Sequence, residues 1–105
     1  MKIAITSTGN NPNAMIDPRF GRCAYFAIYD TESKKVEFLE NPSAEASSGA
    51  GPAAVQFIAK QKVSKVISGD FGNKILSLME KLNITMQIEN DLQQTINDII
   101  NQIKI

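Results

Sequence analysis

The feature that most constrains the fold is a change of hydrophobic periodicity about halfway along the chain. The first half contains three short segments that have the alternation, or the β-branched and aromatic content, of strands: Lys2–Ser7, Ala24–Asp30 and Lys35–Glu40. Residues 31–34 between the last two are polar and short enough for a hairpin turn. The first half is therefore predicted to form three strands, the last two of them antiparallel.

The second half alternates helical and strand patterns instead. Pro52 suits the first turn of a helix, because a residue there needs no N–H group. Val63–Ser68 then has the composition of a buried strand. The apolar face predicted for the first helix consists of Ala54, Val55, Ile58 and Ala59.

Two more helices and one more strand are predicted after residue 68. The next helix is expected to begin at Gly72 or Asn73 and to end at Asn83 in the left-handed conformation. Asn90 or Asp91 is expected to cap the last helix. The apolar positions are Ile75, Leu78, Met79 and Leu82 in the first of these helices, Ile84, Met86 and Ile88 in the strand, and Leu92, Ile96, Ile99, Ile100 and Ile103 in the last helix.

The predicted element order is therefore βββαβαβα, in a single α/β domain over residues 1–105. Strands joined through helices run parallel with right-handed crossovers, whereas a tight hairpin joins antiparallel neighbours. These rules favour a five-stranded mixed sheet in the order 3-2-1-4-5, with only strand 2 antiparallel, and three helices. This arrangement resembles the ribonuclease H-like fold.

The same topology brings four loop segments to one end of the strands. Residues 8–22, 41–51, 69–73 and 89–91 all emerge there, and the first two are the longest predicted loops. Open α/β sheets bind ligands at the carboxyl ends of their parallel strands. This end of the sheet is therefore the predicted place of function.

Composition excludes several classes of protein. Eleven basic residues balance eleven acidic ones, which argues against a nucleic-acid partner. We expect no membrane partner and a cytoplasmic location, because no apolar run approaches the ~20 residues of a membrane span, no secretory signal precedes the first strand, and a single cysteine suits a reducing compartment. Histidine is absent and the first strand carries no acid for a two-metal nuclease, so we do not expect an enzyme.

The first candidate for a functional motif is Arg19-Phe20-Gly21-Arg22-Cys23. Two guanidinium groups that flank a glycine could bind an anion and hold the neighbouring thiol partly ionised, as a metal ligand requires. The alternative is that the arginines pair with nearby carboxylates, such as Asp17 or Glu40, and that Cys23 is a small core residue.

Two glycine-bearing turns accompany this motif. Ser48, Gly49 and Gly51 precede or begin a helix, whose N-terminus is a natural anion site, although a flexible loop with a helix cap explains them equally well. Gly69, Asp70 and Gly72 form a strand-to-helix turn whose amides could face the same ligand, with Asp70 more suited to capping than to catalysis.

These motifs together resemble the dinitrogenase iron–molybdenum cofactor biosynthesis family. The similar segments are Met1–Ile5, Arg19–Phe26, Asn41-Pro42, Gly49–Gly51 and Gly69–Gly72, in the family's order. The resemblance implies a ribonuclease H-like fold and a non-catalytic domain that binds or carries an iron–sulfur or iron–molybdenum cluster. It also implies partner proteins that donate or accept the cluster.

The sequence departs from the family pattern at two positions where histidine is common, because Arg19 and Ser48 stand there. Cys23 would then be the only strong protein ligand of a cluster. Two alternatives stay open. The same loops could bind a metal-free anion, such as a nucleotide or phosphorylated metabolite, or the chain could be a protein-interaction module or homo-oligomer with Phe20 and Phe71 as contact anchors.

Overall fold

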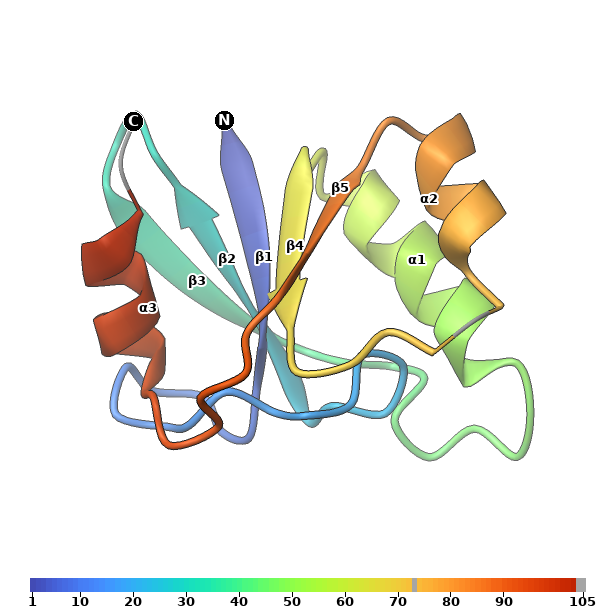
Figure 1. Ribbon diagram of the computed structural model, residues 1–105, viewed down its shortest axis with the longest axis horizontal. Coiled ribbons are helices and arrows are strands. Elements are labelled where there is room, and N and C mark those ends of the chain that lie inside the picture. Colours follow the sequence, from blue (N-terminus) through green and yellow to red (C-terminus); the bar gives the residue numbers. More distant parts are fainter. Residues whose placement is uncertain (73, 104–105) are drawn as a thin grey trace.

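The computed structural model describes residues 1–72 and 74–103 as eight elements (Figure 1). None of the described helices is long and apolar enough to cross a membrane. The elements are β1 (Lys2–Ser7), β2 (Tyr25–Asp30), β3 (Lys35–Glu40), α1 (Ala50–Lys60), β4 (Lys65–Ser68), α2 (Leu76–Lys81), β5 (Thr85–Ile88) and α3 (Ile96–Gln102).

The strands form one sheet in the order β3-β2-β1-β4-β5. β2 pairs antiparallel with both β1 and β3, whereas β1 pairs parallel with β4 and β4 parallel with β5. Only β2 is reversed. The predicted fold class, sheet order and strand directions are therefore confirmed.

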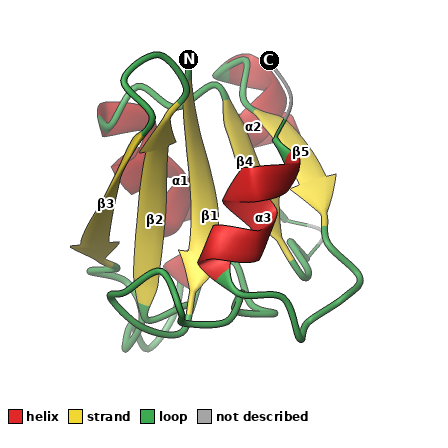
Figure 2. Cartoon of the chain, turned by 90° about the vertical axis from the view of Figure 1, so that its left-hand side faces the viewer, coloured by secondary structure: helices red, strands yellow, loops and turns green. Residues whose placement is uncertain are grey.

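Helices cover both faces of the sheet, with α1 and α2 on one face and α3 on the other (Figures 1 and 2). β1 is buried on both sides, because Ala4 belongs to the core under α1 and α2 while Ile3 and Ile5 belong to the core under α3. This two-sided burial explains why three consecutive residues of β1, Ile3, Ala4 and Ile5, are apolar.

Two helices begin at residues that differ from the predicted ones. α1 begins at Ala50, inside the loop predicted for residues 41–51, because Gly49 takes a left-handed conformation (φ 69°) and turns the chain into the helix; Pro52 lies in its first turn, as predicted. α3 begins at Ile96, not near Asn90 or Asp91. The cause is a capping box in which Thr95 and Asp98 each bond to the other's backbone N–H, and it leaves Leu92 in a turn, 42% exposed.

α2 is shorter than predicted. It begins at Leu76, whereas the predicted starts were Gly72 and Asn73. Gly72 lies before the helix with a φ of 73°, and Asn73 is outside the described residues. The prediction for the other end is confirmed, because Asn83 follows the helix with a left-handed φ of 57°.

Candidate functional site

The loops that follow β1, β3, β4 and β5 gather at one end of the sheet, the bottom of Figure 1. We call these loops the strand-end rim: residues 8–24, 41–49, 69–72 and 89–95. Their common location was predicted from the topology and is confirmed.

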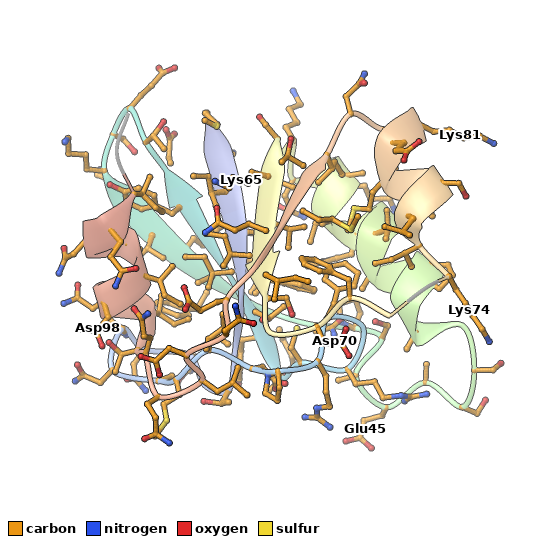
Figure 3. The ribbon with its side chains drawn as sticks, viewed as in Figure 1. Glu45, Lys65, Asp70, Lys74, Lys81 and Asp98 are labelled. Atoms are coloured by element: carbon orange, nitrogen blue, oxygen red, sulfur yellow. The ribbon has the colours of Figure 1, made fainter. Side chains whose placement is uncertain are left out.

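A pocket of about 420 Å³ opens in the part of the strand-end rim that lies over α1 and α2. This volume is within the range of small-ligand sites. The charged side chains that line it are Arg22 and Lys74, and no carboxylate of the described residues does so. Figure 3 shows Lys74 beside the first turn of α1, while Glu45 points away at the bottom of the view. The rim pocket is lined by Gly21, Arg22, Gly49, Ala50, Gly51, Pro52, Phe71, Gly72, Lys74 and Ile75.

Arg22 is held at the pocket by neutral partners. Its Nη1 donates to the carbonyl oxygens of Ala46 (2.6 Å) and Ala44 (3.4 Å). Within residues 1–72 and 74–103, the structure records no ion pair for Arg22. Carbonyl groups orient a guanidinium without cancelling its charge, so Arg22 keeps its full positive charge at the pocket wall.

Arg19 is placed differently. Its Nε donates to Asp17 Oδ1 at 3.2 Å and its Nη2 donates to Asp17 Oδ2 at 3.3 Å. The hydrogen bond to this carboxylate, together with its negative charge, raises the pKa of Arg19. Arg19 does not line the rim pocket, so only one of the two predicted arginines contributes to it.

The loop that carries Arg22 touches the first turn of α1 through two glycines. A Cβ atom on Gly21 would lie 2.8 Å from Gly51 N and 3.0 Å from Gly51 Cα. Such contacts are too short for any side chain, so Gly21 must be glycine for the two backbones to meet. This close approach brings Arg22 beside the N-terminus of α1.

Two buried polar residues fix the same contact. Asn41 Nδ2 donates to the carbonyl oxygens of Gly21 (3.0 Å) and Cys23 (2.9 Å), and its Oδ1 accepts the N–H of Ser43 (3.0 Å). Ser43 Oγ lies within hydrogen-bond distance of the carbonyl oxygens of Gly21 and Ala50. Asn41 and Ser43 therefore join the Arg22 loop to the start of α1.

The first turn of α1 adds its own positive potential. No side chain caps it, and it contains no acidic residue. The first N–H groups of a helix have no internal partners, and the helix dipole places partial positive charge there. Gly49, Gly51 and Gly72 of the predicted turns line the pocket beside this helix end.

Cys23 lies beneath the pocket instead of in it. Its side chain is fully buried, and Sγ lies 3.3 Å from the carbonyl oxygen of Phe20, to which the thiol donates. Burial, and then the negative charge of Asp17, raise the pKa of Cys23 to about 12, although a hydrogen bond from Asn41 acts in the opposite direction. The predicted partly ionised thiol is wrong, and the structure agrees with the alternative of a small core residue.

The remaining predicted residues lie outside the pocket wall. Gly69 packs against Pro18, where an added Cβ would meet Pro18 Cα at 2.7 Å. Asp70 Oδ1 accepts the N–H of Gly72 at 3.2 Å, so its carboxylate shapes the turn. Ser48 is exposed and does not line the pocket.

The two phenylalanines suggested as contact anchors differ in exposure. Phe20 is 2% exposed, and its ring packs against those of Phe26 (centroids 5.7 Å apart) and Phe71 (5.6 Å). It therefore belongs to the core and cannot anchor a partner. Phe71 lies above it, half-buried, and lines the rim pocket.

Sequence reasoning assigned no role in the site to three residues of this region, although Asn41 belongs to one of the segments that resemble the family. Lys74 carries the second positive charge of the pocket, and nothing in its sequence context marks it. Asn41 and Ser43 hold the loops together. Their signal was available, since an asparagine that follows a strand and precedes a proline commonly turns the chain through its side chain.

No described residues form a cluster of three or more His, Cys, Asp or Glu side chains that could hold a metal ion. The chemistry that the rim pocket offers is attraction of an anion by Arg22, Lys74 and the N-terminus of α1.

Comparison with known proteins agrees with this fold. The apo orange protein of Desulfovibrio gigas superimposes with a TM-score of 0.87 at 29% identity, over 96% of this chain and 84% of that one. A Thermotoga protein assigned as NifB, of the DUF35 family, superimposes with a TM-score of 0.81 at 32% sequence identity. The match covers 95% of this chain and 84% of that one. An uncharacterized protein of Methanocaldococcus jannaschii is 31% identical over 93 residues, which is 86% of this chain and 75% of the relative. The model of the dinitrogenase iron-molybdenum cofactor family matches residues 1–104, and the chain belongs to that family.

Proposed function

We propose that this chain binds a preassembled, anionic metallocluster of the iron–sulfur or iron–molybdenum type as cargo during cofactor biosynthesis, without catalysing a reaction. Membership of the dinitrogenase iron-molybdenum cofactor family supports the cofactor class. The similarity to a Thermotoga protein assigned as NifB supports a role in its biosynthesis. The observation that carries the proposal is a pocket whose charged lining groups are both cations.

Charge is the physical basis of the proposed binding. Iron–sulfur clusters with sulfide and thiolate ligands carry net negative charge, and that charge is a main determinant of their chemistry. Arg22 and Lys74 supply two positive charges, and the uncapped first turn of α1 adds N–H donors. A pocket lined by charges of one sign raises the local concentration of a ligand of the opposite sign.

The residues present do not fit a cluster that is bonded to the protein. Cys23 is the one thiol of the chain, and it is buried and protonated at neutral pH. The cargo would therefore keep its own ligands and stay exchangeable, as transfer between a donor and an acceptor protein requires. We propose such proteins as partners, and the cytoplasm as the compartment in which the transfer takes place.

Anaerobic gel filtration with a synthetic, thiolate-capped [4Fe–4S] dianion tests the proposal. Wild-type protein is expected to co-elute with the visible absorption of the cluster, and Lys74→Gln is expected to weaken binding about fivefold through loss of one charge. Lys81→Gln is the matched control, because Lys81 lies at the other end of α2, far from the pocket (Figure 3). Absence of co-elution, or an equal loss with Lys81→Gln, would contradict the proposal.

A metal-free anion is the second candidate, and the absence of a metal-ligand set among the described residues favours it. Arg22 and a helix N-terminus are also the groups that bind phosphate. Thermal unfolding with ATP and with inorganic pyrophosphate separates the two candidates. Stabilisation by these ligands that Arg22→Gln abolishes, together with no binding of the synthetic cluster, would favour a phosphorylated ligand.

A further inference from the structure

We propose that β5 pairs with β5 of a second copy of this chain, in antiparallel orientation, so that the two sheets join edge to edge. β5 is the last strand of the sheet, next to β4. Figure 2 shows it at the outside of the sheet, opposite the edge formed by β3.

The outward-facing backbone groups of β5 can be identified from its bonds to β4. Thr85 N–H donates to Ser64 O at 2.9 Å, and Glu89 N–H donates to Ser68 O at 2.9 Å. Successive residues of a strand point their N–H and C=O groups to opposite sides. The groups of Met86 and Ile88 therefore point away from β4, toward the open edge.

The two edges of the sheet differ in how they are protected. β3 carries Lys35, Glu37 and Glu40, and charged side chains on an edge strand discourage pairing with another chain. β5 has the sequence Thr-Met-Gln-Ile, which contains neither a charge nor a proline. Of the two edges, β5 is the one whose sequence permits pairing.

The pattern of β5 is also self-complementary. A two-fold axis through Gln87 places Met86 of one copy opposite Ile88 of the other, and these residues can then exchange both of their free backbone hydrogen bonds. Their side chains form an apolar cross-strand pair. Ile88 is 57% exposed in the single chain, so pairing buries apolar surface that otherwise faces solvent.

Charges on the α3 face of the sheet favour the same register. Lys65 is in register with Thr85, and both Lys65 and Glu89 line a pocket of about 190 Å³ on that face. The two-fold axis places Glu89 of the second copy opposite Thr85 of the first. Because Lys65 lies one strand further in, on β4, Glu89 of the second copy is two strand spacings, or about 10 Å, from Lys65. A lysine and a glutamate side chain together span that distance, and the symmetry repeats the contact. Glu89 Oε2 accepts hydrogen bonds from Asp91 N–H and Gln94 Nε2, so Oε1 is the atom assigned to the lysine.

Sedimentation equilibrium over a range of protein concentrations tests this proposal. A four-residue strand forms a small interface, so we expect a weak dimer that grows with concentration. Gln87→Lys places two lysines opposite each other at the axis and is expected to weaken the dimer about fivefold or more. Gln56→Lys, an exposed site on α1 with the same change of charge, is the control.

A charge exchange tests the register independently. Lys65→Glu and Glu89→Lys are each expected to self-associate less than wild type, because like charges then face each other. An equimolar mixture of the two is expected to associate about as well as wild type, because both contacts regain opposite charges. A wild type that is monomeric throughout, a dimer that Gln87→Lys does not weaken, or a mixture no better than its components would overturn the proposal. Circular dichroism verifies that each variant is folded.

Discussion

The strand-end rim is held together differently on its two sides. On the side of α3, which we call the closed half, Ile16 N–H donates to Gln94 O at 3.0 Å, Ile96 N–H donates to Ala14 O at 2.9 Å, and Met15 bridges to Thr95. On the side of α1 and α2, which we call the open half, backbone hydrogen bonds run from Phe20 N–H to Asp70 O and from Asn41 N–H to Ala24 O. The side chains of Asn41, Ser43 and Arg22 add further links there, in the half that holds the rim pocket.

The two arginines of the Arg19–Cys23 motif also differ in their electrostatics. Arg19 is paired with the buried carboxylate of Asp17. Arg22, in the open half, bonds only to carbonyl oxygens in the described residues. The charge of Arg22 is therefore available for a ligand, whereas the charge of Arg19 contributes to the structure of its own loop.

The largest expected effect comes from Asn41→Ala. This change removes the hydrogen bonds that Nδ2 donates to the carbonyl oxygens of Gly21 and Cys23 and the one that Oδ1 accepts from Ser43 N–H, at a cost of about 3 kcal/mol in the free energy of unfolding. Urea unfolding measures it. Asn13→Ala, at an exposed site, is expected to change stability by less than about 0.5 kcal/mol. Equal effects of the two variants would mean that side chains do not hold the open half together.

Gly21→Ala is expected to cost about 2 kcal/mol, because its Cβ would collide with the backbone of Gly51. Gly49→Ala meets no atom within 4 Å and is strained only by its φ of 69°, so a cost of about 1 kcal/mol is expected. Thermal or urea unfolding ranks the two. The reverse order would show that the contact between loop and helix is looser than described.

Cys23 makes the stability of the open half depend on pH. Its pKa is raised to about 12 in the folded chain from about 9, so the unfolded chain loses this proton first as pH rises. Stability is therefore full below about pH 9 and falls between about pH 9 and 12, by about 1 kcal/mol at pH 10.

Urea unfolding of wild type and Cys23→Ala at about pH 8 and pH 10 measures this effect, since the variant lacks the thiol. The stability difference between them is expected to shrink by about 1 kcal/mol at the higher pH. A constant difference would indicate a thiol that is accessible to solvent and ionises in the folded chain.

The smallest expected effect on ligand binding is that of Thr95→Ala, in the closed half. Loss of the capping box costs about 1 kcal/mol of stability. Binding of the synthetic cluster is expected to stay unchanged, because Thr95 does not line the rim pocket. A loss of binding comparable to that of Lys74→Gln would show that the two halves are coupled.

The sheet order could be predicted because the change from period-two to helical patterns leaves few topologies open. The environment of Cys23 could not be predicted, because Gly21 and Arg22 form a turn, and the side-chain directions around a turn do not follow from hydrophobic periodicity. Arg22 points to solvent and Cys23 to the core, although they are neighbours in the sequence. Lys74 was missed for a related reason, since only the folded chain brings it to the first turn of α1.

The start of α3 shows how local rules compete. Asn90 and Asp91 both have the chemistry of a helix cap, yet the helix begins after Thr95. Asp98 decides the position, because it completes a reciprocal pair of hydrogen bonds that residues 90 and 91 do not make.

The central claim is that an anionic cargo is held by charge at the rim pocket and not by the thiol beneath it. Anaerobic titration of the synthetic [4Fe–4S] dianion into Arg22→Gln and Cys23→Ala tests this claim most directly. We expect Arg22→Gln to weaken binding about tenfold and Cys23→Ala to bind like wild type. Binding that Cys23→Ala abolishes and Arg22→Gln preserves would contradict the account.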